Sequence, residues 1–153
     1  MPVRVFISHS VAPWELALVN SVADVTAQRG ATPTIPDRAW KPSVDSLPSR
    51  IAAQIQASDY LIAIATQWGQ HLDWLNQEVM YNQQLSKPSL IVADAGIPLA
   101  PEYDCIRIDR ANPLATLIHV SNRIQGLIQD HQTQALMRGL LITGLALLFL
   151  KGK

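Results

Sequence analysis

The sequence has little of what marks several classes of protein. Cys105 is the one cysteine in 153 residues, so no internal disulfide can form, and its place in an apolar run predicts a buried thiol. The 12 basic and 12 acidic residues give a net charge of zero, and no run of Lys and Arg occurs. We therefore expect no nucleic-acid partner. His71, His119 and His131 are isolated and lack metal-ligand spacing, so we expect no metal.

The amino terminus also lacks the marks of a secretory signal. Residues 1–7 run straight into a predicted strand, with no long apolar segment and no small-residue cleavage site. We therefore expect the folded part to face the cytoplasm. A chain of 153 residues with 48% hydrophobic content suffices for one domain with a core. We expect residues 1–131 to form that domain and residues 132–153 to form a hydrophobic C-terminal helix.

Short apolar runs rich in β-branched residues alternate with segments of helical period. This alternation predicts an α/β fold, with a flavodoxin-like five-stranded parallel sheet and helices on both faces. The segments between the runs are long enough for right-handed crossovers. The predicted strands are Val3 to Ser8, Ala31 to Ile35, Tyr60 to Ala65, Ser89 to Ala93 and Cys105 to Ile108.

Helix signals fill the first two crossovers. A first helix is predicted from about Pro13 to Gln28, with Glu15 near its positive end and Gly30 just past its stop. The second crossover begins with a long polar loop, residues 36–46, before a helix that starts near Leu47. Long loops tend to be functional, so this loop is a candidate binding element.

The remaining crossovers differ in their signals. Lys87 before Pro88 ends the third helix. Prolines and glycine between Asp94 and Asp104 predict a connection that is mostly loop. Asn112 followed by proline starts the last helix of the domain, which we expect to end near residue 131.

The composition changes abruptly at residue 135. Residues 135–150 are almost entirely apolar and are followed by Lys151 and Lys153. As a helix this segment reaches about 24 Å, whereas the hydrocarbon core of a bilayer is about 30 Å thick. The segment can therefore span a membrane only if its flanking basic residues snorkel to the interface or the bilayer thins locally. We expect binding to membrane lipid, with the protein tail-anchored at the cytoplasmic face. The alternative is a helix packed within an oligomer or a core, in a cytoplasmic protein.

One pentad points to chemistry. Trp74 and Glu78 are four residues apart in a predicted helix, which places an indole and a carboxylate on one helix face. The helix follows the buried third strand, so the pair lies just past a carboxyl strand end, where open α/β sheets bind ligands. An aromatic plane beside a lone acid suits a nucleotide with a labile glycosidic bond.

Three features together resemble the bacterial Toll/interleukin receptor (TIR) domain family. The first strand ends in a Phe-Ile-Ser-His-Ser sequence, residues 6–10, the loop after the second strand carries Asp37 and Trp40, and the third helix carries the Trp-x-x-x-Glu pentad of Trp74 and Glu78. The resemblance covers roughly residues 3 to 128. The chain departs from the family where an acid often follows the first box, at residues 11–13, and where a glycine often ends the long loop, at residues 44–46.

The resemblance implies cleavage of NAD at its nicotinamide-ribose bond, with NAD as substrate and no separate cofactor. It places the catalytic glutamate at Glu78 and substrate contacts at Trp74, Asp37 and Trp40. It also implies substrate contacts from the first box, at residues Phe6, Ser8, His9 and Ser10. The further implications are activation by self-association of TIR domains and a role in bacterial antiphage signalling.

The chemistry of nicotinamide release agrees with a single carboxylate. Nicotinamide leaves as a neutral molecule from a cationic pyridinium, so its departure needs no general acid. Glu78 could hold the ribose hydroxyls and stabilise an oxocarbenium-like transition state, while Trp74 stacks on a ring of the ligand. Water or a ring nitrogen of the ligand then traps the ribosyl cation, and the sequence does not choose between hydrolysis and cyclisation.

Other interpretations of these residues remain open. A non-enzymatic TIR adaptor that acts through domain contacts uses the same fold and has no need of Glu78. Trp40 fits a ligand or subunit contact as well as a local anchor, and His9 fits a cleft position as well as an internally hydrogen-bonded one. Ser8 and Ser10 could simply cap the following turn. A receiver domain or a flavodoxin is disfavoured, because residues 8–12 offer neither clustered acids nor a hydroxyl-rich phosphate loop.

Overall fold

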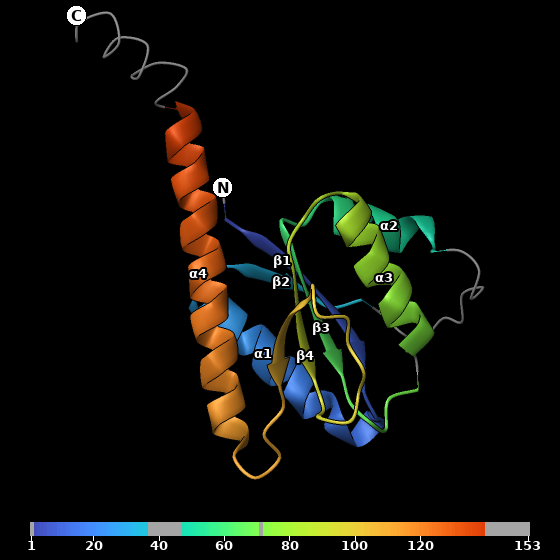
Figure 1. The fold of residues 1–153 in the computed structure, drawn as a ribbon. Helices are drawn as coiled ribbons and strands as arrows, with labels where there is room; N and C mark the ends of the chain where they lie inside the picture. The colour runs from blue at the N-terminus through green and yellow to red at the C-terminus, as the bar shows by residue number, and fades with distance from the viewer. Residues whose placement is uncertain (1, 37–46, 71, 140–153) are drawn as a thin grey trace, which may run out of the picture.

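A computed structural model describes residues 2–36, 47–70 and 72–139 of the chain. Its centre is a five-stranded sheet with strand order β2-β1-β3-β4-β5, in which every neighbouring pair is parallel (Figure 1). The predicted α/β fold with a parallel sheet is confirmed. The strands are β1 (Arg4–Ser10), β2 (Thr32–Thr34), β3 (Tyr60–Ala65), β4 (Ser89–Ala93) and β5 (Asp104–Arg107).

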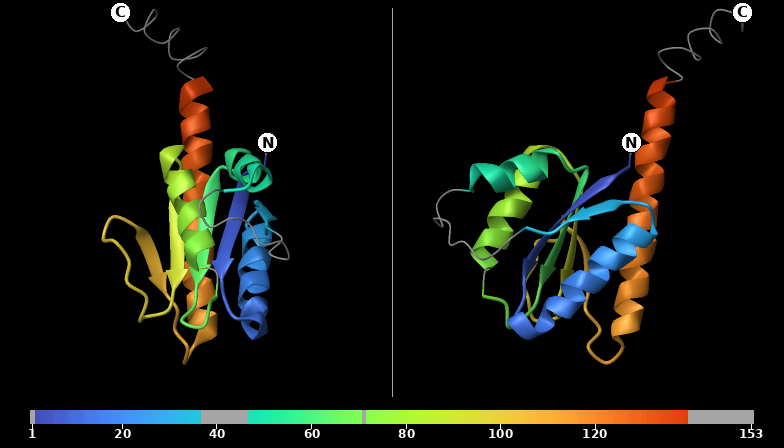
Figure 2. Two further views of the ribbon diagram at one scale, coloured as in Figure 1. Left: turned by 90° about the vertical axis from the view of Figure 1, so that its right-hand side faces the viewer. Right: turned by 180° about the vertical axis from the view of Figure 1, so that it is seen from behind.

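Helices cover both faces of the sheet. Helices α1 and α4 pack on one face, and α2 and α3 pack on the other (Figures 1 and 2). A short 3-10 turn, η1, precedes α1. The bounds are η1 (Pro13–Glu15), α1 (Leu16–Gln28), α2 (Ser49–Gln56), α3 (Leu72–Gln84) and α4 (Pro113–Gly139).

The two faces of the sheet carry separate hydrophobic cores. Along β1, Val5 and Ile7 belong to the core under α1 and α4, whereas Phe6 belongs to the core under α2 and α3. This follows from the period of two in a strand. All six residues of β3 are buried because this central strand is covered on both faces, which is why it reads as a continuous apolar run.

Several local signals act as predicted. Gly30, with φ of 89°, follows α1 in the left-handed region that glycine tolerates. Residues 94–103 contain no helix, and Arg107 fixes this connection by donating Nη1 to the carbonyl oxygens of Asp94 and Ile97, both at 2.7 Å. The second strand is shorter than predicted. It lies at the edge of the sheet. Pro33 has no backbone N–H to donate, and at an edge this removes no hydrogen bond between central strands.

The last helix continues past the predicted end near residue 131. Residues 132–138 contain no glycine or proline and are good helix formers, so α4 runs on to Gly139. Residues 132–138 are exposed. The division into residues 1–131 and 132–153 stays a prediction. Residues 140–153 lie outside the described part of the chain, and within that part no helix is long and apolar enough to cross a membrane.

Candidate functional site

Glu78 lies on the face of α3 that packs against β1. Its side chain has no exposed surface, and its Oε1 accepts a hydrogen bond of 2.8 Å from the Oγ of Ser8. Trp74 is one helical turn earlier on α3 and is partly buried. The structure therefore brings Glu78 together with Ser8 of the first box, and it confirms that α3 carries both residues of the pentad.

The buried Glu78 carboxyl group is held by a hydrogen bond to β1. A carboxylate removed from water needs hydrogen-bond donors to offset its lost hydration, and the Ser8 hydroxyl is one such donor. This contact links α3 to a central strand across a separation of 70 residues. The exposed fraction of Glu78 is 0%, so solvent does not reach this residue in the structure.

The other residues of the first box take different positions. Phe6 is fully buried in the core under α2 and α3. His9 is 7% exposed and lies two residues after Ile7 in β1, so its side chain points to the same face as Val5 and Ile7. That is the face under α1 and α4, opposite to Glu78. Ser10 ends β1, and its carbonyl oxygen accepts the N–H of Thr66. Strand alternation thus divides the first box between the two faces of the sheet.

Two of the predicted substrate contacts belong to the loop after β2. Asp37 and Trp40 lie outside the described residues, so their predicted roles stay predictions. Cys105 is partly buried in β5 as a free thiol. In the described part of the chain, no three His, Cys, Asp or Glu side chains are grouped so that they could hold a metal ion.

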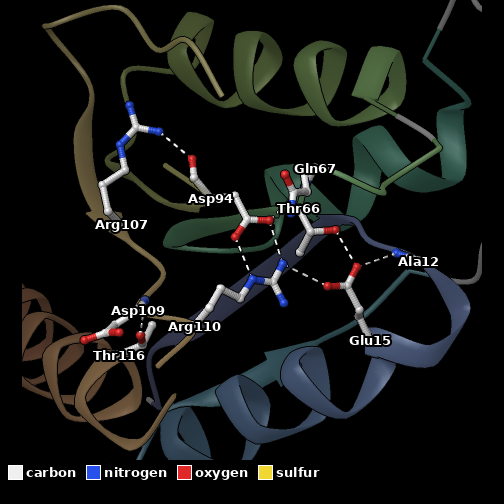
Figure 3. A network of polar contacts seen from close by, with 9 residues as sticks. All are labelled: Ala12, Glu15, Thr66, Gln67, Asp94, Arg107, Asp109, Arg110 and Thr116. Carbon is white, nitrogen blue, oxygen red and sulfur yellow. Dashed lines mark hydrogen bonds and ion pairs between the residues drawn. The ribbon is translucent and has the colours of Figure 1, made fainter. Parts of the chain in front are cut away.

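A second polar cluster, which the sequence did not predict, lies at the carboxyl edge of the sheet (Figure 3). Arg110, in the loop before α4, donates Nε to Asp94 Oδ1 at 2.8 Å and Nη2 to Asp94 Oδ2 at 2.6 Å. The same Nη2 is 2.9 Å from Oε2 of Glu15. Glu15 Oε1 accepts the Thr66 hydroxyl at 2.6 Å and the backbone N–H of Ala12 at 3.1 Å. We call Glu15, Thr66, Asp94 and Arg110 the edge cluster.

The edge cluster keeps both of its acids ionised. Hydrogen bonds from Arg110 lower the pKa of Asp94 despite its burial, with help from the backbone N–H of Gln67. Burial alone would raise the pKa of Glu15. The hydrogen bonds from Thr66, Ala12 and Arg110 outweigh this effect, and the pKa of Glu15 is below its ordinary value.

Sequence reasoning could not find this cluster because its members are far apart along the chain. Glu15 has an ordinary interpretation as an acid at a helix start. The one signal in the sequence is that Asp94 and Arg110 follow two neighbouring parallel strands, β4 and β5, and this signal does not include Glu15.

Two cavities lie in this part of the molecule, and the first of them adjoins the edge cluster. One, of about 530 Å³, lies between α1, α4 and the loop after β3, and is lined in part by Trp14, Trp68 and Arg110. The other, of about 370 Å³, lies beside α3 and the connection between β4 and β5. Neither is lined by Glu78 or Trp74.

The strand order and the helices on both faces define a protein of the flavodoxin-like α/β class, with polar side chains gathered toward the carboxyl edge of the sheet. No family model matches the sequence, and no curated protein matches it. Solved structures are similar in fold. An NAD(P)H:quinone oxidoreductase from Methanothermobacter marburgensis has a TM-score of 0.56 and 11% identity, covering 83% of this chain and 100% of that one.

Two further structures share the architecture. The sugar isomerase domain of an RpiR transcription factor from Sphaerobacter thermophilus has a TM-score of 0.52 at 10% identity, covering 91% of this chain and 78% of that one. A flavodoxin from the domain Archaea has a TM-score of 0.50 at 3% identity, covering 82% of this chain and 99% of that one. At such identities the similarity establishes the fold alone.

Proposed function

We propose that the chain is a TIR-like enzyme that cleaves the nicotinamide-ribose bond of NAD, with Glu78 as the catalytic carboxylate. The observation that carries the proposal is the place of that carboxylate. It lies between α3 and a central strand, is held by Ser8 at 2.8 Å, and has Trp74 one turn away. Buried acids near the ligand-binding edge of an α/β sheet are candidates for function.

The proposed chemistry uses one acid and one aromatic ring. The Glu78 carboxylate binds the ribose hydroxyls and stabilises positive charge on the ribosyl carbon as the C–N bond breaks. Nicotinamide takes the bonding electron pair and leaves as a neutral molecule. Water then adds to the ribosyl cation and loses a proton, which gives ADP-ribose; attack by a ring nitrogen of the ligand gives a cyclic product instead. Trp74 stacks on a ring of the substrate.

The remaining parts of the proposal concern assembly and location. Self-association brings the loop of residues 36–46, with Asp37 and Trp40, to the site of a neighbouring copy and activates it. Residues 135–150 bind membrane lipid at the cytoplasmic face. A place in bacterial antiphage signalling follows from the family resemblance. Support for these parts comes from the sequence, through the apolar run and the polar loop that contains an aromatic residue.

Nicotinamide release by concentrated, lipid-bound full-length protein tests the enzymatic proposal. Glu78→Gln keeps the shape of the side chain and removes its negative charge, so we expect the rate to fall by at least about 100-fold, as when an electrostatic stabiliser is removed. Glu102→Gln makes the same substitution at an exposed position between β4 and β5 and should leave the rate unchanged. Equal rates in the Glu78→Gln variant and the unaltered protein would refute the proposal.

A second candidate function is a non-enzymatic TIR adaptor. The complete burial of Glu78 and its hydrogen bond to Ser8 favour it, because these features also suit a structural link between α3 and β1. An adaptor tolerates Glu78→Gln in a domain-binding assay and loses binding when Trp40 is substituted. The enzymatic proposal expects product formation to be lost in Glu78→Gln, so the Glu78 variant distinguishes the two functions.

A further inference from the structure

The cavity between α1 and α4 has two features of a small-molecule site. Trp14 and Trp68 both line it, and they are 74% and 51% exposed. Large apolar side chains that gather at one exposed place commonly mark a binding surface. The volume of about 530 Å³ falls within the range of pockets that hold small organic ligands.

Arg110 supplies directed hydrogen-bond donors in the wall of this cavity. Its guanidinium carbon lies 5.2 Å from the centre of the Trp68 ring, so the indole fixes one side of the group. Its Nε and Nη2 are taken by Asp94 and Glu15. Nη1 has no partner among the described residues and carries no dashed line in Figure 3. Since the side chain is 44% exposed, two N–H groups are available to a ligand.

The charge of the edge cluster decides which ligands fit. One guanidinium faces two carboxylates, so Glu15, Asp94 and Arg110 together carry a net charge of −1 at neutral pH. Because the pKa values of both acids are lowered, both stay ionised at neutral pH and the net charge stays at −1. A phosphate or other anion would meet an arginine that is already neutralised. The cavity therefore favours an uncharged, planar ligand with hydrogen-bond acceptors.

We propose that this cavity binds an uncharged oxopurine nucleoside. The base stacks on the exposed face of Trp14, and its O6 accepts one N–H of Arg110 Nη1. The O6 of an oxopurine is among the nucleobase acceptors that arginine recognises most often. This site is separate from the proposed NAD site, because neither Glu78 nor Trp74 lines the cavity.

The test uses the full chain with 5-fluorotryptophan at its four tryptophan positions, so that fluorine NMR follows each indole separately. Single Trp→Phe variants assign the four resonances, and inosine is the probe. We expect the Trp14 and Trp68 resonances to shift with one shared dissociation constant, and the Trp74 resonance not to follow that curve. Adenosine is the comparison ligand, since it carries an amino group in place of O6 and lacks the N1 proton of inosine, and it should bind at least about tenfold more weakly.

Two protein variants sharpen the test. Trp14→Leu removes the stacking face at an exposed position and should lower the affinity for inosine by about tenfold, which is within the range for loss of one stacked aromatic. Glu78→Gln should leave inosine binding unchanged whether or not NAD is cleaved. The failure of one proposal is thereby distinguished from the failure of the other.

Four results would overturn the assignment. They are the absence of any shift of Trp14 and Trp68 with inosine, equal affinity for adenosine, tighter binding of inosine monophosphate than of inosine, and shifts that follow protein concentration alone. The last result would identify the cavity as a contact between copies of the chain.

Discussion

At the scale of single residues, a close backbone contact holds the loop after β3 against the end of β1. The N–H of Thr66 donates to the carbonyl oxygen of Ser10, and the N–H of Gly69 donates to the carbonyl oxygen of Thr66, both at 3.0 Å. A Cβ atom at Gly69 would lie 2.0 Å from the Ser10 carbonyl oxygen. No side chain fits at that distance, so the close approach itself requires glycine at this position.

Substituting Gly69 by alanine should therefore displace this loop or the end of β1. We expect Gly69→Ala to lower the free energy of unfolding by about 1–3 kcal/mol, the usual cost of overpacking. Gly96→Ala is the matched control, because nothing lies within 4 Å of its Cβ position, and it should change stability by less than about 0.5 kcal/mol. Urea unfolding measures both, and equal losses in the two variants would contradict the explanation.

Sequence reasoning identifies single residues better than it identifies pairs. Helical period places Trp74 and Glu78 on one face of α3, as predicted. It does not indicate that Ser8 donates to Glu78, because the two residues are 70 positions apart and no local pattern relates them. Strand alternation separates His9 from Ser8, because neighbouring residues of a strand point to opposite faces of the sheet.

At the scale of elements, the edge cluster connects four segments of the fold. Arg110 in the loop before α4 contacts Asp94, which follows β4, and Glu15, which ends η1. The Thr66 hydroxyl adds the end of β3. The sequence predicted these elements with useful accuracy. It did not predict their connection, since each polar residue has a sufficient local explanation where it stands.

The edge cluster should make stability depend on pH in the acid range. The pKa values of Glu15 and Asp94 are lowered in the folded protein, so the unfolded chain binds more protons once the pH falls below about 4, the ordinary range for these groups. Their contribution is fully present above that pH and is lost as the pH falls through the lowered pKa values.

Asp94→Asn removes one of these two groups, so we expect a shallower decline of the free energy of unfolding below about pH 4. Asp24→Asn, at an exposed position on α1, should retain the original slope. Urea unfolding at constant ionic strength across this pH range measures the difference. An unchanged slope in Asp94→Asn would show that Asp94 does not contribute to the acid dependence.

At the scale of the whole molecule, the fold follows from the alternation of apolar runs and helical segments. The central strands β3 and β4 were predicted with their observed bounds, because burial on both faces leaves an unbroken apolar signature. The end of α4 was predicted too early. The apolar pattern weakens near residue 131 where the helix leaves the core, but helix propensity continues the backbone to Gly139.

The C-terminal segment gives the clearest prediction for the complete molecule. Among the described residues, both hydrophobic cores are built from positions up to 128, so a chain that ends at Gly139 should keep the unfolding free energy of the full chain. The full chain should float with phospholipid vesicles, whereas the shortened chain should stay in the aqueous fraction, because residues 140–150 supply most of the apolar surface that lipid would cover.

Leu145→Lys in the full chain is the sharper variant, since it keeps the length of the segment and introduces a charge that costs about 2.5–3.5 kcal/mol near the centre of an inserted helix. It should reduce flotation strongly without changing the unfolding free energy. If the full chain instead stays in the aqueous fraction and both variants lose stability or oligomeric state, the segment packs against protein. The tail then belongs to an assembly of copies, and the membrane proposal is wrong.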